Sequence, residues 1–331
     1  MPLSSNQLYG VEAMTQAINK LPATSSTIRD LGIFKKEMLS TTYVKVANKN
    51  GQLTLVPNKP RGTPGEPVKE QYGATKTFEM LHLPKDEMVL AEDVQNVKVF
   101  GSTSNTAMTV ANKVADKLAS MRGDIEYTRE HLMLGALKGK LLDANGSTVL
   151  VDIYQEFGLT RQSFDLKLSS ATVDVSVALE DTLTALAKNQ KGESANGWIV
   201  LASPEFMRAF KYNKSIKDLY ARFQDLSGVY RTGTTAPFNH LGIDFIQYNH
   251  TFEDGATIDA NTAIILPKGT SSTFREYFAP GDMNATVNTV ALEFYATREA
   301  LQHDLGWSLR AQSNPLPLVL RPELVATLTM S

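Results

Sequence analysis

Residues 105–138 carry the longest helical periodicity in the chain. The apolar residues follow one another at steps of three, four or seven, which places them on one face of an α-helix. That face consists of Val110, Val114, Leu118, Met121 and Ile125. A continuous helix of this length would measure roughly 50 Å, longer than a compact domain of ordinary size needs. We therefore expect either a kinked helix or a spine within a larger structure, packed on a sheet through this face.

Residues 44–83 form a long excursion without a core of its own. Strand-forming residues at 41–46 and 53–56 flank an Asn-Gly pair, which is typical of a hairpin turn. Residues 57–67 are too rich in proline and glycine for a helix or a central strand. Strand character returns at 75–83. The pattern predicts an exposed, extended loop with two strand-like arms.

Basic residues outnumber acidic ones in this excursion. Between residues 45 and 76, six basic side chains accompany two acidic ones, a net charge of +4, whereas the whole chain has a net charge of −2. The six are Lys45, Lys49, Lys59, Arg61, Lys69 and Lys76. They either keep exposed strand edges soluble or form a docking arm for an acidic neighbour. Candidate acidic partners on that neighbour are Asp86, Glu87, Glu92 and Asp93.

The rest of the chain mixes helices and strands without regular alternation. A short helix is predicted within residues 8–21, and a hairpin over 139–150. Ser203-Pro204-Glu205 combines an N-cap, a first-turn proline and an acid, so a helix is predicted to begin there. Further elements are a helix near 177–189 and strands at 198–201, 243–248, 263–266, 286–296, 305–311, 315–320 and 325–328. This order predicts an α+β fold and disfavours a doubly wound parallel sheet. The length of 331 residues favours about two domains.

Composition excludes several kinds of chemistry. The chain contains no cysteine, so disulfides, thiolate metal sites and cysteine nucleophiles are ruled out. A net charge of −2 gives no bulk attraction for phosphates, so sequence-independent and weak contact with DNA is the most that is expected. No run approaches the ~18 apolar residues that cross a bilayer, and no membrane association is expected.

Catalytic motifs are weak or missing. The histidines at 82, 131, 240, 250 and 303 include no helical zinc pair, although a site assembled from distant segments around His240 or His303 stays open. Residues 228–235 have the glycine spacing of a phosphate-binding loop, but Thr234 stands where the lysine is required. The acidic pairs at 86–87 and 92–93 are typical of solvated surface charges. We expect no enzyme activity, no cofactor and no metal.

Several stretches, taken in order, resemble a known family. They are Arg275-Glu276-Tyr277-Phe278-Ala279-Pro280-Gly281-Asp282, then Asn288-Thr289, then Gln312-Ser313-Asn314-Pro315-Leu316-Pro317-Leu318 and Arg321-Pro322. This ending is similar to that of tailed-phage major capsid proteins of the lambda E type. The long helix closing at Leu137-Lys138-Gly139-Lys140 takes the place of the family's spine helix, and the excursion takes the place of its extended loop, the E-loop.

The resemblance implies a shell subunit with four parts. These are an N-terminal arm at 1–40, an E-loop at 41–84, a peripheral domain at 85–150 and 285–312 with its spine helix at 105–138, and an axial domain at 151–284 and 313–331. It implies pentamers and hexamers of this chain, scaffolding and decoration proteins as partners, non-specific enclosure of double-stranded DNA, and assembly in the host cytoplasm into a virion. A lysine–asparagine cross-link is not implied. A cellular nanocompartment shell of the same fold and a soluble hydrolase are the competing readings.

Overall fold

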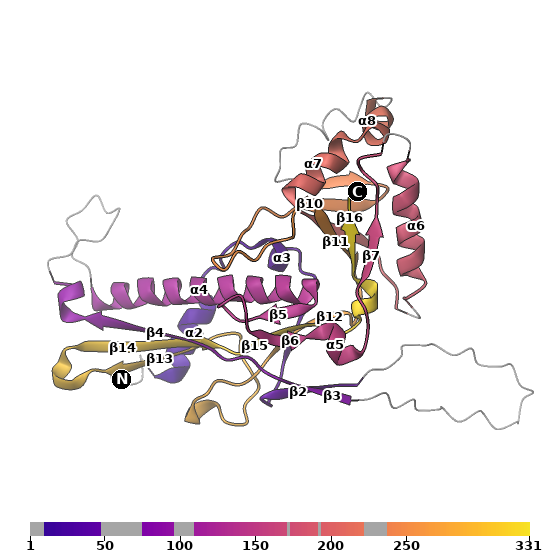
Figure 1. Cartoon of the computed structure of the whole chain (residues 1–331). Helices are drawn as coiled ribbons and strands as arrows, with labels where there is room; N and C mark the ends of the chain where they lie inside the picture. The colour runs from indigo at the N-terminus through magenta and orange to yellow at the C-terminus, as the bar shows by residue number, and fades with distance from the viewer. Residues whose placement is uncertain (1–9, 48–74, 96–108, 171–172, 191–192, 222–236) are drawn as a thin grey trace, which may run out of the picture. The chain divides into compact units, whose positions relative to one another are not determined.

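The computed structural model describes residues 10–47, 75–95, 109–170, 173–190, 193–221 and 237–331 (Figure 1). The chain divides into two compact units. Unit 1 comprises residues 1–44, 77–132 and 276–317, and unit 2 comprises 45–76, 133–275 and 318–331. Helices and strands occur in both, as the α+β prediction requires.

The elements in chain order are as follows. The helices are α2 (Val11–Lys20), α3 (Thr27–Asp30), α4 (Val110–Lys138), α5 (Ile153–Phe157), α6 (Val175–Ala187), α7 (Pro204–Tyr212) and α8 (Lys214–Ala221). The strands are β1 (Lys35–Met38), β2 (Tyr43–Ala47), β3 (Thr75–Glu79), β4 (Leu83–Leu90), β5 (Lys140–Leu142), β6 (Val149–Asp152), β7 (Gln162–Asp165), β8 (Gly197–Ala202), β9 (Phe238–His240), β10 (Ile243–Gln247), β11 (Thr262–Lys268), β12 (Phe274–Phe278), β13 (Tyr295–Ala300), β14 (Gly306–Ser313), β15 (Pro315–Val319) and β16 (Ala326–Thr329). The smaller sheets have the orders β1-β12-β15, β2-β3 and β5-β6.

Unit 1 is built around the antiparallel sheet β13-β14-β4. Helices α4 and α2 pack on one face of this sheet, and their apolar side chains form a shared core with Val89, Leu309 and Ala311 of the strands. Helix α2 also satisfies the backbone of the edge strand β13. Thr15 Oγ1 accepts the Ala296 N–H at 3.2 Å, so side chains of α2 take the place of a missing neighbouring strand.

The helix α4 is shorter at its start than the periodicity predicted. It begins at Val110 and not at residue 105, because Thr109 Oγ1 accepts the Asn112 N–H at 3.2 Å in the position of an N-cap. Residues 105–108 lie outside the described part of the chain. The 29 residues of α4 give a length of about 43 Å.

Most of the predicted helix face is buried. Val114, Leu118, Met121 and Ile125 are 1–4% exposed and belong to the core under the sheet. Val110 is 39% exposed, so its assignment to the core is wrong. As the first residue of the helix it stands before the buried part of the apolar face.

Unit 2 contains the six-stranded mixed sheet β7-β16-β11-β8-β10-β9. Strands β10 and β8 are parallel, as are β16 and β7, and the remaining pairs are antiparallel. Helices α6, α7 and α8 bury their apolar residues against this sheet. The predicted start of α7 is confirmed, because Ser203 accepts the Phe206 N–H and Pro204 occupies the first turn.

Two other expectations are settled by the strands. The hairpin at 139–150 is confirmed by β5 and β6. The strand expected at 286–296 is wrong over most of its length, because β13 begins at Tyr295. The preceding loop is held by its own hydrogen bonds, and Asn288 adopts a φ of 58°, which no strand accommodates. Residues 53–56, the second arm of the expected hairpin at 41–56, lie outside the described part; β2 pairs with β3.

Among the described residues, no helix joins the length and the apolar character that a membrane span requires.

Replacing Leu118 by alanine should remove about 2–5 kcal/mol from the free energy of unfolding, because the side chain is fully buried between α4 and the sheet. Urea denaturation of the unassembled chain measures this. Val110→Ala, at an exposed position of the same helix, is the matched control and should change the value by less than about 0.5 kcal/mol. Equal effects of the two substitutions would contradict the packing described here.

Candidate functional site

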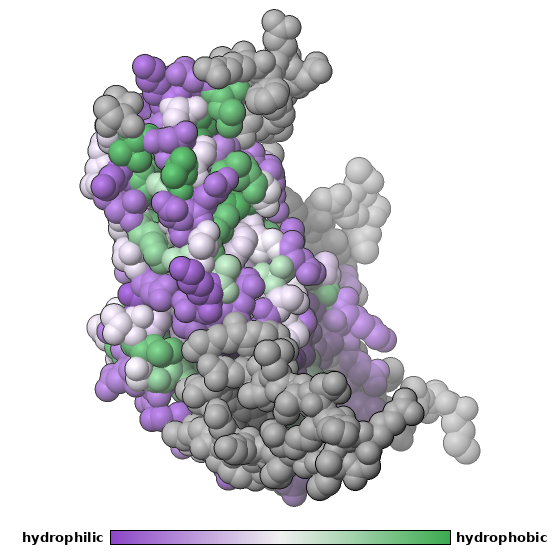
Figure 2. All heavy atoms as spheres, turned by 90° about the vertical axis from the view of Figure 1, so that its right-hand side faces the viewer, coloured by the Kyte–Doolittle hydropathy of each residue, from purple (hydrophilic) through white to green (hydrophobic). Residues whose placement is uncertain are grey.

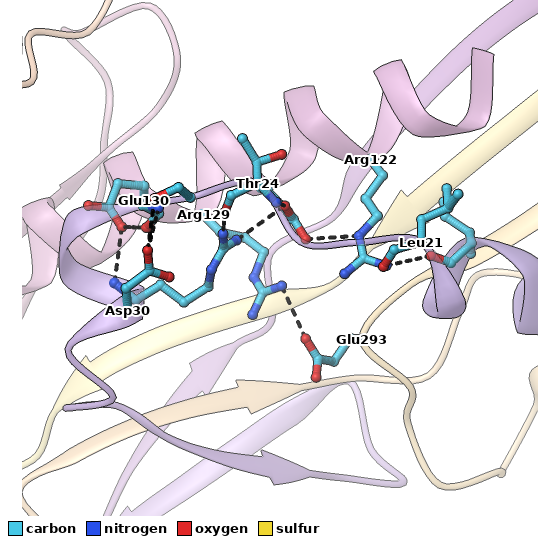
Figure 3. A network of polar contacts seen from close by, with 12 residues as sticks. Leu21, Thr24, Asp30, Arg122, Arg129, Glu130 and Glu293 are labelled. Atoms are coloured by element: carbon cyan, nitrogen blue, oxygen red, sulfur yellow. Dashed lines mark hydrogen bonds and ion pairs between the residues drawn. The ribbon is translucent and has the colours of Figure 1, made fainter. Parts of the chain in front are cut away.

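A charged face on α4 is the most elaborate polar feature of unit 1 (Figure 3). Arg122, Glu126, Arg129 and Glu130 are spaced by four, three and one residues, so they lie on one side of the helix. All four side chains are buried. Buried charges are tolerated only when they are paired and hydrogen-bonded, and each of these four has such partners.

Arg129 is held by two carboxylates. Its guanidinium, 1% exposed, forms a two-pronged pair with Glu276 of β12, with Nε–Oε1 and Nη2–Oε2 both at 2.8 Å. Its remaining nitrogen, Nη1, donates to Glu293 at 3.3 Å. The Phe278 and Phe294 rings lie 4.9 Å and 5.5 Å from the guanidinium carbon. The arrangement ties α4 to two segments of the chain more than 140 residues further on.

Glu126 and Glu130 hold the N-terminal segment by its backbone. Glu126 accepts the Thr24 N–H at 2.6 Å. Glu130 accepts the Ile28 N–H at 2.8 Å and also bonds the Ser26 hydroxyl, so its carboxylate lies at the N-terminus of the short helix α3. The helix dipole favours an anion there.

Arg122 holds the same segment from the carbonyl side. Its Nη1 donates to the carbonyl oxygens of Ile18 and Leu21, at 2.6 Å and 2.8 Å, while its Nε donates to Glu126. Together with Glu126 and Glu130, it fixes residues 18–28 on α4.

The ion pairs shift the acidities of this network. Burial alone would raise the pKa of Glu126, but the hydrogen bonds from Thr24 and Arg122, with the charge of Arg29, outweigh it and leave that pKa below its ordinary value. Burial would likewise raise the pKa of Glu293, and Lys36 and Arg129 overcome this and lower it. Burial would lower the pKa of Arg129, whereas Glu276 raises it. All three groups are therefore charged at neutral pH.

The basic residues expected in the E-loop are only partly placed. Lys49, Lys59, Arg61 and Lys69 lie outside the described residues. Lys45 is an exposed residue of β2. Lys76 pairs with Glu156 of its own chain at 3.2 Å, an acid that the sequence reasoning did not consider.

The acidic candidates differ in how they are engaged. Asp86 forms a two-pronged pair with Arg310, both distances being 2.7 Å, and Glu87 pairs with Lys117 at 2.9 Å. Asp93 accepts the Leu90 N–H at 2.9 Å and so closes a turn. Glu92 is exposed. Asp86 and Glu87 would have to share or exchange their own partners in order to bind a neighbour.

The structure places both histidines that the sequence left open as site residues. His240 is buried, lies 3.1 Å from the Ser176 hydroxyl and packs edge-on against Phe210. His303 lies on the exposed turn between β13 and β14. Within the described ranges, no group of three or more His, Asp or Glu side chains is placed to hold a metal ion. The glycine-rich stretch at 228–235 lies outside those ranges.

Sequence reasoning missed the charged face of α4 altogether. The spacing of these four charged residues can be seen in the sequence. However, charged residues on a helix are normally exposed to water, so the spacing does not indicate burial. Glu276 lies in one of the stretches that carried the family resemblance, yet only its contact with Arg129 gives it a role.

The fold is that of phage capsid proteins. The structure is similar to the putative capsid protein of a prophage of Escherichia coli CFT073, with a TM-score of 0.59 and 15% identity over 100% of both chains. It is also similar to a phage-related protein of Bordetella bronchiseptica RB50, with a TM-score of 0.54 and 11% identity over 97% of both chains. The capsid protein of cyanophage P-SCSP1u gives a TM-score of 0.53 at 12% identity, covering 94% of this chain and 90% of the other.

The sequence assigns the chain to a family within this fold. Residues 10–330 match the phage major capsid protein E family, and the chain belongs to it. The major capsid protein of Salmonella phage Felix O1 is 25% identical over 97% of this chain and 96% of its own length. That of Pseudomonas phage KPP10 is 22% identical over 94% of both. The resemblance seen in the sequence is confirmed.

Removing one partner of the buried Arg129–Glu276 pair should strongly destabilise the chain. Arg129→Met leaves the buried carboxyl group of Glu276 without its two-pronged partner, so it should lower the free energy of unfolding by about 3–5 kcal/mol. In the double variant with Glu276→Met, no buried charge is stranded on β12 and part of the loss should be recovered. Arg310→Met, at the exposed pair with Asp86, should cost no more than about 1 kcal/mol. Urea denaturation of all four chains measures these values, and equal losses for Arg129→Met and Arg310→Met would refute the role of the buried pair.

The same network should make unit 1 sensitive to acid. The pKa of Glu126 is lowered in the folded chain, so the stabilisation is complete above its unfolded pKa of about 4.3 and is lost as the pH falls through the lower folded value. Unfolding in urea, measured between pH 7 and pH 3, should therefore become easier below about pH 4.3. Glu126→Gln should flatten this dependence, whereas Glu180→Gln, an exposed position of α6, should leave it as in the parent. A parent-like slope in Glu126→Gln would contradict the assignment.

Proposed function

We propose that this chain is the major capsid protein of a tailed phage, which self-assembles into the icosahedral shell around the double-stranded DNA genome. The observation that carries the proposal is the match of residues 10–330, nearly the whole chain, to the phage major capsid protein E family. The curated relatives, matched over almost their full lengths, are major capsid proteins.

The structural features suit a shell subunit. Unit 1 is stiffened by a buried ion network. We assign the N-terminal arm to residues 1–40, the E-loop to 41–84, the peripheral domain to 85–150 and 285–312, and the axial domain to 151–284 and 313–331. The length of α4 supports its assignment as the spine helix, and the charge of the excursion between β2 and β3 supports its assignment as the E-loop, whereas the two compact units divide the chain at other residues.

The role is structural and not enzymatic. Subunits associate as pentamers and hexamers, take part in assembly with scaffolding and decoration proteins in the host cytoplasm, and become part of the virion shell. Contact with the packaged DNA is non-specific, since the net charge of −2 offers no bulk attraction for phosphates. A cellular nanocompartment of the same fold is disfavoured, because the matched family and both curated relatives are phage capsid proteins.

Electron microscopy of the purified chain tests the proposal. Closed shells are the expected result, and shells that enclose nucleic acid after expression in a packaging host identify a phage capsid. Shells that enclose an enzyme would instead support the nanocompartment. A chain that stays monomeric under all assembly conditions would overturn both.

The E-loop should act as an electrostatic docking arm. Reversing Lys59, Arg61 and Lys69 together to Glu should leave normal circular dichroism but prevent closure of shells. Each exposed pair contributes only ~0.2–1 kcal/mol, so the single reversals should have little effect. The matched control reverses Lys20, Lys188 and Lys214, three exposed lysines elsewhere, and thus makes the same change in net charge. The two triple variants are compared by sedimentation. Equal assembly at low and moderate salt would show that the basic residues of the E-loop are merely solubilising.

A further inference from the structure

The loop between β12 and β13 (Figure 1) carries three apolar side chains that are exposed to solvent. Val287 is 64% exposed, Val290 66% and Leu292 48%. Residues 283–292 contain no charged side chain. Depletion of charge around exposed apolar residues is typical of the centre of an interface. We call residues 287–292 the apolar tip.

The apolar tip is held in one conformation by the body of unit 1. Thr286 Oγ1 donates to the Gly281 carbonyl at 2.6 Å, and the Ala291 N–H donates to the Leu39 carbonyl at 2.8 Å. The Tyr295 hydroxyl, on a buried ring, accepts the Leu292 N–H at 2.8 Å. A surface fixed in this way loses little conformational entropy when it binds.

Exposed apolar residues of unit 2 are arranged differently. In Figure 2 the apolar areas of the face shown are divided by polar ones. Val149 and Val177 are 49% and 55% exposed, but Val177 has the acids Glu180 and Asp181 within one turn of α6. Single exposed apolar residues are normal on soluble proteins. The apolar tip differs in that its three exposed apolar residues lie within one six-residue segment, which contains no charged side chain and is held by hydrogen bonds.

We infer that the apolar tip docks on a second copy of this chain in the assembled shell, an inference that rests on the proposed function. The small exposed area of the apolar tip favours a second copy of the chain as its binding partner. Three half-exposed side chains offer at most a few hundred Å², against roughly 800 Å² per partner in a stable pairwise complex. A free partner would bind such a patch too weakly, whereas a shell repeats the contact at every subunit and adds it to the other contacts in the lattice.

The surface beside the tip extends the same face. A groove in unit 1 is lined by residues 279–288, by Ser40–Tyr43 and Met80–His82 at the bases of the two strand-like arms, and by the charged Glu299 and Arg310. The apolar tip therefore adjoins the excursion that is proposed to dock electrostatically. Burial of the apolar tip would add to the free energy of assembly a contribution that salt does not screen.

A double substitution tests the docking. Val287→Ser with Val290→Ser should leave the circular dichroism and the urea midpoint of the unassembled chain unchanged, because neither side chain is buried in it. It should raise the chain concentration required for half-maximal assembly by about tenfold or more, including at 1 M salt. Val149→Ser with Val177→Ser makes the same chemical change at exposed positions of unit 2 and should assemble like the parent.

Cross-linking identifies the occupant. Because the chain contains no cysteine, Val290→Cys provides a unique thiol for a photoactivatable benzophenone maleimide. Irradiated shells should yield covalent pairs of chains, and unassembled chains should not. Links confined to one chain would show that another part of the same molecule covers the tip, and would overturn the inference. So would normal assembly of the double serine variant, which leaves the proposed function intact; a parent chain that forms no shells overturns the proposed function itself.

Discussion

The two-pronged pair between Arg129 and Glu276 is the contact on which the organisation of unit 1 depends. Two opposite charges are withdrawn almost completely from water, and the cost of that withdrawal is offset only while both stay aligned. Helix α4, strand β12 and the segment that carries Glu293 are thereby held in one relative arrangement. An apolar contact in the same place would tolerate slippage, whereas the fixed geometry of a guanidinium and a carboxylate does not.

The neighbouring charges extend this constraint to the N-terminal segment in a particular way. Glu126, Glu130 and Arg122 bind backbone N–H and carbonyl groups of residues 18–28. The binding of this segment to α4 therefore depends less on the identity of the segment's side chains than on the path of its backbone. Helix α4 thus combines two functions on neighbouring faces, because its apolar residues close the core over the sheet while its charged residues position the N-terminal segment.

A shell subunit needs both a rigid body and surfaces that bind its neighbours, and here these come from different parts of the chain. The buried network and the sheet β13-β14-β4 supply the rigid body. The proposed contact surfaces are the basic excursion at 44–83 and the exposed side chains of the apolar tip at 287–292. Each surface is too weak to hold two free molecules together. Repetition in a closed lattice converts such weak contacts into a stable shell.

The sequence by itself determined the class of the fold, the long helix, the buried face from Val114 to Ile125, the cap at Ser203 and the family, because local periodicity, capping chemistry and the order of short motifs are properties of neighbouring residues. Only the tertiary structure decided that Val110 is exposed, that Asp86 and Glu87 have partners in their own chain, and that residues 287–294 form a loop and not a strand. It also revealed Arg122, Glu126, Arg129 and Glu130 as buried. A charged residue on a helix has the same local sequence pattern whether its side chain faces water or pairs with a residue 147 positions away. Its burial depends on the segments that pack against it, and the local sequence does not encode these.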